Sequence, residues 1–369
     1  MRLGRRFRAT SSTLPAKRKR NAGRFQLEPL EARLLMAADT HASATASAPP
    51  SLSAAVGGPN IVIINTDDQQ FDTLRFMPRT TAELVNSGTT FANSFATAAV
   101  CGPSRANLLT GQYSHNNGVL WNEPPMGGFE NFNDTSTLAT WLQGAGYRTG
   151  MVGKYMNSYD KFATANADPQ NTYVPPGWSD WQAFVGASYY NFTLSNNGAS
   201  EFHAGYSTDI LAQKSVSFLN ASEANDAQPF FLYFTPHAPH TPSNPAQRDL
   251  NTFANVPDHR PPNYNEADVS DKPNWVKRLP LATAQQQADL DLFRQRQLEA
   301  LQSVDDAVGN IMDALRANGE LTNTVVIFTS DNGQMWGEHR FDKKDVPYEE
   351  AIRTPLVIRD GRDPVQQTA

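Results

Sequence analysis

The sequence predicts an α/β fold with a mostly parallel central sheet that is flanked by helices. Short apolar runs rich in β-branched residues, such as those at 60–65 and 324–329, are typical of strands buried on both faces. Longer stretches with a helical spacing of apolar residues lie between these runs, and this alternation indicates βαβ units. The 369 residues, of which 39% are hydrophobic, are enough for one large α/β domain or two ordinary ones.

The expected strands are recognised by their apolar runs and by the residues at their borders. The run NIVIIN at 60–65 follows Pro59, and the run FFLYF at 230–234 follows Pro229. Proline and other turn-forming residues at such borders separate a strand from the preceding element. In chain order, we expect strands at 60–65, 147–152, 230–234, 324–329 and 355–358.

The expected helices are bounded mainly by glycine, which is the residue most often found just after a helix. Gly88, Gly144 and Gly319 follow three of them, and the longest carries a one-sided stripe of apolar residues that predicts packing on the core. We expect helices at 79–87, 138–143, 210–219 and 285–318. The stretch 244–280 is rich in Pro, Asn and Asp and is predicted to be a long surface excursion.

The first 58 residues differ from the rest and are predicted to be a basic, disordered export and linker segment, with one domain following at 59–369. The apolar core at 34–38 is shorter than the ~7–15 residues of a secretory signal. The run LEPLEARLL at 27–35 nevertheless resembles an N-terminal motif of large exported bacterial proteins. We therefore expect an exported bacterial protein, whether periplasmic, cell-surface or secreted; the alternative is a basic disordered tail.

Charge and cysteine content exclude several classes of protein. Residues 1–39 contain ten Lys/Arg and three Asp/Glu, so the remaining 21 Lys/Arg and 34 Asp/Glu give the body a net charge of −13. An acidic body argues against a nucleic-acid partner. The single cysteine excludes a disulfide framework and a cysteine-rich zinc or iron–sulfur site. No apolar run approaches the ~20 residues that cross a bilayer, so we expect no transmembrane segment.

Two of the predicted strands end in acidic or amide side chains. Asp67 and Asp68 follow the strand at 60–65, and Asp331 and Asn332 follow the strand at 324–329. Ligands of open parallel sheets bind beyond the carboxyl ends of the strands, so both pairs are expected at one crevice. Three carboxylates and an amide oxygen suit Ca²⁺ or Mg²⁺. The alternative is that each pair serves only as a helix N-cap or a turn.

The only cysteine, Cys101, precedes a predicted helix that continues to Thr110. Pro103 is expected at the first helical position, which would direct free N–H groups and the positive end of the helix dipole toward an anion. Arg105 adds a planar guanidinium suited to sulfate or phosphate oxygens. The alternative is that the cysteine is a small buried apolar residue.

The residues around Cys101 belong to a pattern that extends to distant parts of the chain. Cys-x-Pro-Ser-Arg at 101–105, followed by LLTG at 108–111, resembles the signature of the sulfatase family, whose cysteine is oxidised to formylglycine after translation. The resemblance covers about residues 59–358 and implies the alkaline-phosphatase-like α/β fold. The further segments that match the family pattern are Asp67–Asp68, Gly153–Lys154, His237–His240, Asp331–Gly333, Gly337–His339 and Lys344–Glu350.

The resemblance implies a metal centre and a modified nucleophile. Asp67, Asp68, Asp331 and Asn332, together with the modified Cys101, would bind Ca²⁺, with Mg²⁺ as the alternative. A formylglycine-generating maturation enzyme would convert the cysteine. One hydroxyl of the hydrated aldehyde would attack sulfur, and deprotonation of the other would then expel sulfate.

The resemblance also implies cationic contacts to the substrate. Arg105, Lys154 and Lys344 would neutralise the sulfate oxygens, although the neighbouring Lys343 remains an alternative to Lys344. His240 would donate to the leaving oxygen or hold the sulfate, whereas His237 is expected to pack or hydrogen-bond at the end of its strand.

The remaining histidine and the segment after Lys154 bear on the substrate. His339 is expected either to contact the substrate or to support a residue that does. Many sulfatases carry a histidine where this chain has Met156, and GKYMN at 153–157 resembles the branch that includes N-acetylglucosamine-6-sulfatases. The resemblance therefore implies hydrolysis of a sulfate ester, on a sulfated sugar or polysaccharide.

Two other functions remain open at this point. The first is a phosphonate or phosphate monoester hydrolase, because relatives with the same cysteine signature act on phosphorus esters. The second is a non-catalytic protein that binds sulfated glycans. The chain stops at Ala369, where family members usually continue into a small antiparallel subdomain. We expect a fragment, a truncated product or a short member of the family.

Overall fold

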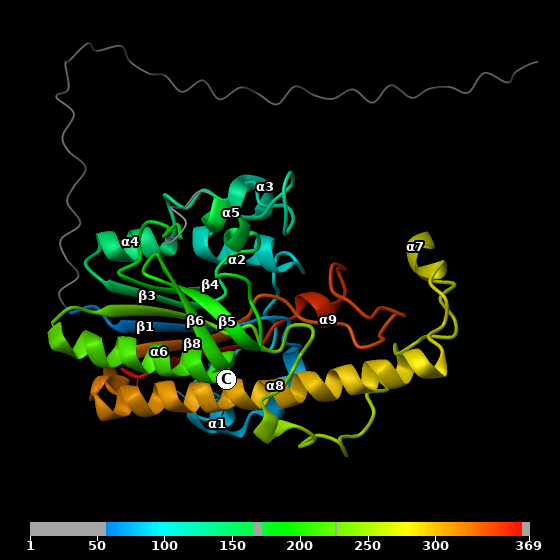
Figure 1. The fold of residues 1–369 in the computed structure, drawn as a ribbon. Helices are drawn as coiled ribbons and strands as arrows, with labels where there is room; N and C mark the ends of the chain where they lie inside the picture. The colour runs from blue at the N-terminus through cyan, green and yellow to red at the C-terminus, as the bar shows by residue number, and fades with distance from the viewer. Residues whose placement is uncertain (1–56, 166–171, 226, 364–369) are drawn as a thin grey trace, which may run out of the picture. The chain divides into compact units, whose positions relative to one another are not determined.

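A nine-stranded mixed sheet organises the part of the chain that the structure describes, namely residues 57–165, 172–225 and 227–363 of a computed structural model (Figure 1). The strand order is β2-β9-β8-β1-β7-β3-β4-β5-β6. The five central strands, β8 to β4, run parallel, and antiparallel pairs complete both edges. This confirms the predicted α/β fold. The export and linker segment predicted at 1–58 lies outside the described residues except for Gly57 and Gly58.

The strands include all five that the sequence predicts. The strands are β1 Asn60–Thr66, β2 Thr89–Thr90, β3 Arg148–Gly153, β4 Asp180–Phe184, β5 Tyr190–Asn196, β6 Ala199–Tyr206, β7 Phe230–Thr235, β8 Thr324–Ser330 and β9 Leu356–Asp360. The antiparallel strands β5 and β6 were not predicted. They are only half buried and contain several polar residues, so they lack the continuous apolar runs of the central strands.

The described helices include the predicted ones, and the short helices α3, α5, α7 and α9 were not predicted. The helices are α1 Pro78–Thr80, α2 Cys101–Thr110, α3 Ser114–Asn117, α4 Leu138–Gly144, α5 Tyr159–Ala165, α6 Ser207–Ser222, α7 Asn274–Lys277, α8 Ala284–Ala317 and α9 Glu349–Ile352. The helix predicted at 79–87 is only one turn of α-helix, which continues as a π-helical turn at Thr81–Val85. No helix in the described ranges is both long and apolar enough to cross a membrane.

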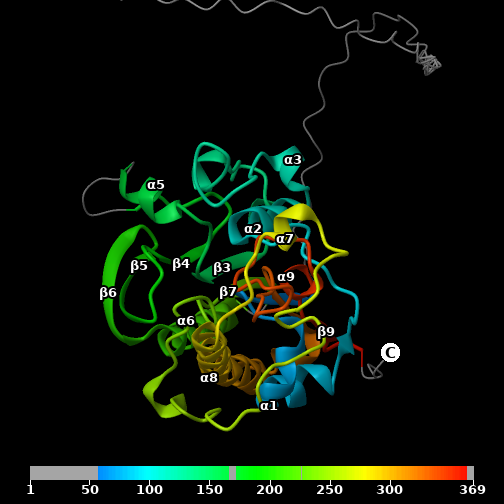
Figure 2. The same ribbon diagram turned by 90° about the vertical axis from the view of Figure 1, so that its right-hand side faces the viewer.

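Helices cover both faces of the sheet, with α6 and α8 on one face and α2 and α4 on the other (Figures 1 and 2). Alternate residues of the central strands supply the two cores, because successive side chains of a strand point to opposite faces. Val62 and Ile64 pack with α6 and α8, whereas Ile63 packs with α2 and α4. The parallel strands are therefore buried on both sides, and their carboxyl ends are held in fixed positions.

The surface excursion predicted at 244–280 contains α7 and is exposed over much of its length. One part of it pairs with the segment that follows β8. Tyr264 and Glu338 form an isolated β-bridge, and the His339 N–H donates to the Asn263 carbonyl at 2.7 Å. The excursion thus fixes the backbone of the segment that leads to Lys344.

Candidate active site

The carboxyl ends of β1 and β8 bring the two acidic pairs together. The strands are in register from Asn60 opposite Thr324 to Thr66 opposite Ser330, so Asp67 and Asp331 follow side by side. The Asp331 carboxylate accepts hydrogen bonds from the backbone N–H of Asp68 at 3.1 Å and of Asn332 at 2.8 Å. Asp68 has φ of 66°, in the left-handed region that non-glycine residues seldom adopt, and this contact supports that conformation.

The carboxyl ends of the neighbouring strands β7 and β3 carry basic side chains. Lys154 follows β3 and donates from Nζ to Asp67 Oδ2 at 2.5 Å. His237 lies just beyond β7, with its Nδ1 atom 3.4 Å from the same oxygen. Gly153 makes this approach possible: its φ is 122°, and a Cβ there would lie 2.0 Å from the Thr235 carbonyl oxygen. Only glycine fits between the two strands at that point.

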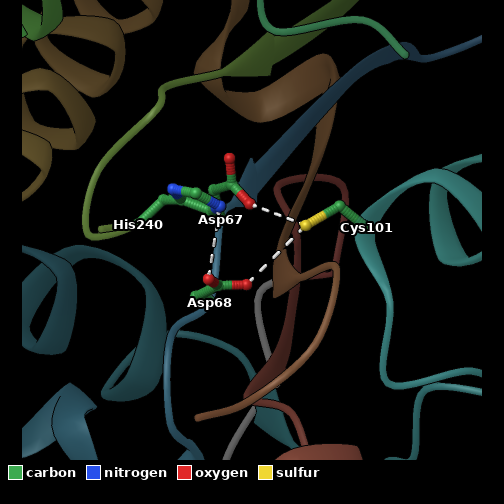
Figure 3. A group of neighbouring side chains, drawn as sticks. All are labelled: Asp67, Asp68, Cys101 and His240. Atoms are coloured by element: carbon green, nitrogen blue, oxygen red, sulfur yellow. Dashed lines mark hydrogen bonds and ion pairs between the residues drawn. The ribbon is translucent and has the colours of Figure 1, made fainter. Parts of the chain in front are cut away.

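Cys101 is the first residue of α2 and is fully buried among these groups (Figure 3). Its Sγ atom lies 3.3 Å from Asp67 Oδ1, 3.8 Å from Asp68 Oδ1 and 2.7 Å from Lys344 Nζ. The helix begins two residues earlier than predicted, so Pro103 is its third residue rather than its first. The proline remains compatible with this position because the N–H groups of the first turn have no partner within the helix.

Arg105 is also fully buried and faces the acidic residues from α2. Its Nε atom donates to Asp331 Oδ2 at 2.9 Å, and Nη1 donates to the Lys154 carbonyl at 2.6 Å. Nη2 lies 3.9 Å from Asp67 Oδ2 and has no hydrogen bond within the described residues. Two of the three guanidinium nitrogens therefore fix the site, and the direct contact to sulfate that the sequence suggested stays a prediction.

The ionisation of the cluster follows from burial and close charge pairing. Burial alone would raise the pKa of Asp67, but Lys154, His240, His237 and Arg105 hold that pKa well below its usual value. Asp68 has a lowered pKa for the same reason, with Lys344 as its main partner. Burial and the neighbouring Asp67 raise the pKa of Asp331 to about 6.

The pKa of the Cys101 thiol is shifted upward, whereas the pKa of a catalytic cysteine is shifted downward. Burial, together with the charges of Asp67 and Asp331, raises its pKa well above the usual value despite the two nearby lysines. A nucleophilic cysteine requires a lowered pKa and partial exposure. Unmodified Cys101 has neither, so at neutral pH it is a protonated, enclosed thiol.

The donor atoms at the ends of β1 and β8 fit a hard cation. Asn332 Oδ1 is buried and accepts no hydrogen bond within the described residues, although its amide Nδ2 donates to Asp68 Oδ1 at 2.7 Å. A buried oxygen without a donor, beside three carboxylates, suits a Ca²⁺ or Mg²⁺ ligand set. One ligand atom from each of Asp67, Asp68, Cys101 and His240 also lies within 4.8 Å of the others (Figure 3).

A cavity of about 630 Å³ opens onto this cluster and is referred to below as the main cavity. Asp68, His240 and Lys344 lie at its inner end, and the first turns of α8 form one wall. Its lining also includes apolar side chains, of which Leu290, Phe293 and Phe341 are the largest. A mixed apolar and polar cavity next to reactive groups is typical of a small-molecule site.

The structure distinguishes between the two candidate lysines. Lys344 Nζ contacts both Asp68 Oδ1 and Cys101 Sγ. The Lys343 side chain is exposed and lines the main cavity, and within the described residues it makes no hydrogen bond or ion pair with the cluster. The geometry therefore favours Lys344 as the residue that acts at the reacting atoms.

Two of the candidate histidines lie at the carboxylates and the third does not. His240 Nε2 lies 3.6 Å from Asp68 Oδ2, and His237, expected to pack or hydrogen-bond at its strand end, lies 3.4 Å from Asp67 Oδ2 through Nδ1. His339 is placed away from them. Its ring stacks on Tyr348 at 4.0 Å between ring centroids, and Nδ1 lies 3.1 Å from Glu266 Oε2. It is not among the residues that line the main cavity, so a supporting role fits it better than substrate contact.

Two residues that support the site, the half-buried Asn122 and the buried Glu338, were not predicted from the sequence. Asn122 Oδ1 accepts the Gly102 N–H at 2.8 Å and so holds the start of α2. Glu338 is fully buried; it accepts from Trp336 N at 2.5 Å and lies 2.6 Å from His259 Nε2. Glu338 belonged to a matched segment but was assigned no role. Nothing in the local sequence marks Asn122, because its partner is twenty residues away.

Comparison with known proteins agrees with this geometry. The sulfatase family profile matches residues 59–369. The chain is 35% identical over 312 residues to a putative extracellular sulfatase Sulf-1 homolog of Caenorhabditis elegans, covering 81% of this chain and 43% of that protein. It is 34% identical over 319 residues to the N-acetylglucosamine-6-sulfatase of Capra hircus, covering 82% and 55%. The chain thus spans about half the length of the curated relatives it matches.

Solved structures share the fold. A protein solved in complex with its substrate D-glucosamine-2-N,6-O-disulfate superimposes with a TM-score of 0.67 at 27% identity, covering 83% of this chain and 72% of that one. The phosphonate monoester hydrolase of Agrobacterium radiobacter gives a TM-score of 0.62 at 24% identity, covering 84% and 70%, and this likeness shows the fold alone. With its fold, its buried Asp/Cys/His cluster and the match over nearly all of residues 59–369, the chain belongs to the sulfatase family.

Proposed function

We propose that this protein hydrolyses a sulfate ester of a sulfated sugar, using formylglycine made from Cys101. The observation that carries the proposal is the position of Cys101, fully buried at the start of α2 and in contact with Asp67, Asp68 and Lys344. Burial raises the pKa of the thiol, so the unmodified side chain is unsuited to attack. The same position suits an oxygen nucleophile between carboxylates and ammonium groups.

The modified residue would act through its two hydroxyl groups. Oxidation by a separate maturation enzyme replaces the Cys101 thiol by an aldehyde, and water adds to give a geminal diol. One hydroxyl, losing its proton to a carboxylate such as Asp67, attacks sulfur while the bond from sulfur to the sugar oxygen breaks. The other hydroxyl then loses its proton, the aldehyde forms again and the bond to sulfate breaks. The net reaction consumes one water and releases sulfate and an alcohol.

Neighbouring side chains would protonate the leaving group, neutralise the charge of the sulfate and hold the site in place. His240 faces both the cluster and the main cavity, so it is positioned to protonate the leaving sugar oxygen. Lys154 and Lys344 would neutralise the sulfate oxygens. Burial alone would lower the pKa of each lysine, but Asp67 raises the pKa of Lys154 and Asp68 that of Lys344 above the usual value, so both ammonium groups stay charged. Arg105 holds Asp331 and the Lys154 backbone in place.

A Ca²⁺ ion fits the acidic residues best, with Mg²⁺ as the alternative. Asp67, Asp68, Asp331 and Asn332 would hold it through oxygen atoms, and conversion of Cys101 would replace the one soft sulfur donor by oxygen. When bound, such an ion supplies positive charge that stabilises an anionic transition state. The cluster itself pairs three carboxylates with Arg105, Lys154 and Lys344, so a divalent ion would leave the site attractive to an anion.

The test is to produce the full chain with and without a formylglycine-generating enzyme and to compare the two preparations. Trypsin releases Cys101 in the peptide Thr80–Arg105, whose mass distinguishes a thiol from an aldehyde, and an oxime-forming reagent labels only the aldehyde. Hydrolysis of 4-methylumbelliferyl sulfate and of the corresponding phosphate is measured on the same samples, with Cys101→Ala as the control.

We expect sulfate-ester hydrolysis to rise in proportion to the aldehyde content and to be absent from Cys101→Ala. A converted, folded protein that prefers the phosphate ester would instead be a phosphate or phosphonate hydrolase. A converted protein that binds sulfated glycans but hydrolyses neither these nor the aryl ester would be a binding protein. Either of these results contradicts the proposal.

A further inference from the structure

A second hollow begins at the same reactive cluster. Lys154, His237 and His240 contribute to a cavity of about 210 Å³, and His240 also lines the main cavity. An adjoining cavity of about 340 Å³ extends to Trp121. The two smaller cavities share Asn157, Ser158 and Asp160 as lining residues. The two cavities therefore lie side by side between the reactive cluster and an exposed tryptophan, and together they are referred to below as the Trp121 groove.

The backbone of Trp121 is firmly fixed even though its side chain is 45% exposed. Its carbonyl accepts the Gly128 N–H at 3.0 Å, and Trp121 forms a β-bridge with Gly127. The next residue, Asn122, accepts the Gly102 N–H through Oδ1 and the Ser158 hydroxyl through its carbonyl, at 2.8 and 3.1 Å. The backbone of Trp121 is therefore held near the start of α2, where Cys101 lies.

Trp121, Trp141 and Trp275 are similarly exposed, at 45%, 46% and 41%, but of the three only Trp121 lines one of the cavities described here. Trp178, Trp181 and Trp336 are all less than 10% exposed and pack in the interior. Trp121 instead presents nearly half of its surface while lining a cavity. What distinguishes Trp121 is its place in a groove that adjoins the reactive cluster, where an exposed aromatic ring offers a ligand an apolar surface.

The chemistry of the groove matches a sugar ring. Around the indole lie an amide, a hydroxyl and charged groups of both signs, from Asn122, Glu123, Ser158 and Lys161. Lys161 Nζ and Glu123 Oε1 form an exposed ion pair at 3.0 Å, so this end of the groove has no large excess of either charge. A pyranose offers an apolar C–H face for stacking and hydroxyl edges for these polar groups.

We propose that the Trp121 groove binds the sugar unit next to the one that carries the reacting sulfate. The protein is thereby built for a glycan chain of two or more sugar units rather than for a free sulfated monosaccharide. Trp121 acts as a specificity-determining residue, because it touches the neighbouring sugar and none of the reacting atoms. This inference rests on the proposed sulfatase function and adds the length of its substrate.

The test compares substrates of different length on the Cys101-converted full chain. Three matched pairs are used, each a sulfated monosaccharide and a tetrasaccharide with the same sulfated unit at its non-reducing end, derived from heparin, chondroitin sulfate and carrageenan. 4-Methylumbelliferyl sulfate serves as the short reference substrate. In Trp121→Ala we expect kcat/KM to fall about tenfold on the tetrasaccharide that the wild type hydrolyses best, the effect of losing one stacked ring. The aryl sulfate and the monosaccharide should be unaffected.

Two variants control for indirect effects. Trp141→Ala removes another exposed tryptophan, 46% exposed and outside the cavities described here, and should leave all three substrate classes unchanged. Trp121→Tyr keeps a stacking ring and should restore most of the preference for the tetrasaccharide.

The outcomes separate this inference from the function on which it rests. Equal losses on the aryl sulfate and the tetrasaccharide, or no loss on either, would overturn the groove assignment while leaving a sulfatase. A wild type that hydrolyses the aryl sulfate but gains nothing from chain length would overturn it as well. A converted wild type without activity on any sulfate ester would instead remove the proposed function itself, and this inference with it.

Discussion

The carboxyl edge of the sheet has an acidic half and a basic half that differ in how tightly they are held. The acidic half consists of Asp67, Asp68, Asp331 and Asn332 at the ends of β1 and β8, and each of these residues is at most 2% exposed. The basic half lies at the ends of β3 and β7. Its most open member is His240, whose side chain is 29% exposed.

The difference matches what each half would have to do. Backbone N–H groups and Arg105 fix the Asp331 carboxylate of the acidic half, as a site for a resident ion requires. The basic half opens into the main cavity and the Trp121 groove through His240, as a site that exchanges substrate and product requires. One edge of the sheet thus combines buried acidic residues with basic residues that reach the cavities, and Cys101 lies between the two groups.

Removal of Cys101 should have the largest effect, because this residue serves both halves. In Cys101→Ala we expect aryl-sulfate kcat to fall on the order of 10⁴-fold or more, the loss seen when a nucleophile is deleted. Steady-state kinetics on protein shown to be folded by circular dichroism measures it. Residual activity above one per cent of the converted wild type would assign the nucleophile to another residue.

Removal of the metal should have the second largest effect on activity, because the residues of the acidic half would bind the ion. We expect chelation with EGTA to abolish activity and lower the melting temperature, and Ca²⁺ to restore both. At a free Ca²⁺ concentration one hundred times Kd, binding should stabilise the fold by about 2.7 kcal/mol. Differential scanning fluorimetry across a Ca²⁺ titration measures this shift.

Asp68→Asn is the matched variant for the metal prediction, because it keeps the shape of the side chain and removes one charge. Its melting temperature should respond little to Ca²⁺. If Asp68→Asn and the wild type show the same Ca²⁺-dependent shift, the ion lies elsewhere, and the contrast between the two halves loses its basis.

The paired lysines allow a finer test of the cationic contacts. Lys344→Ala should lower kcat/KM for an aryl sulfate by about 10²- to 10³-fold, because it removes a preorganised cation at the reacting atoms. Lys343→Ala should change it less than about threefold, as expected of an exposed charge. Because Lys344 also neutralises the buried Asp68, the melting temperature of each variant is measured alongside. Equal losses in the two variants would contradict the assignment.

The smallest effect on activity is expected at His339, which lies outside both halves. His339→Asn retains a residue type that tolerates the left-handed conformation, here φ of 52°. It loses the stacking on Tyr348 and the ring's two polar contacts, to Glu266 and Asn263, so urea denaturation should show a stability loss of about 1–2 kcal/mol. Aryl-sulfate kcat/KM should stay near the wild-type value. A selective rise in KM without loss of stability would restore the role in substrate contact predicted from the sequence.

Much of the fold followed from local patterns. The central strands β1, β7 and β8 and the helix α8 have continuous or strongly periodic apolar residues, so their burial is visible in the sequence. The half-buried strands β5 and β6 were missed because they are partly exposed and mix polar with apolar residues. The π-helical turn after α1 was missed because a π-helix and an α-helix share similar residue preferences over one turn.

The candidate site was predictable only where chemistry is marked by neighbouring residues. Cys101, Arg105 and the acidic pairs lie in short motifs, and the choice of an oxygen ligand set follows from residue type alone. Asn122 was invisible, since its contact with Gly102 depends on a loop that returns to α2. The preference for Lys344 over Lys343 depends on which of two adjacent side chains turns inward, which identical residue types do not encode.

The sequence by itself determined the fold class, the family and the short motif that contains Cys101, because each depends on residue types at fixed local spacing. The tertiary structure decided the rest. The sheet places β1 between β8 and β7, so acidic and basic strand ends from distant parts of the chain become neighbours. Strand order, side-chain direction and the path of the Trp121 groove arise from packing between elements. Packing depends on shape across the whole molecule, and no single segment specifies it.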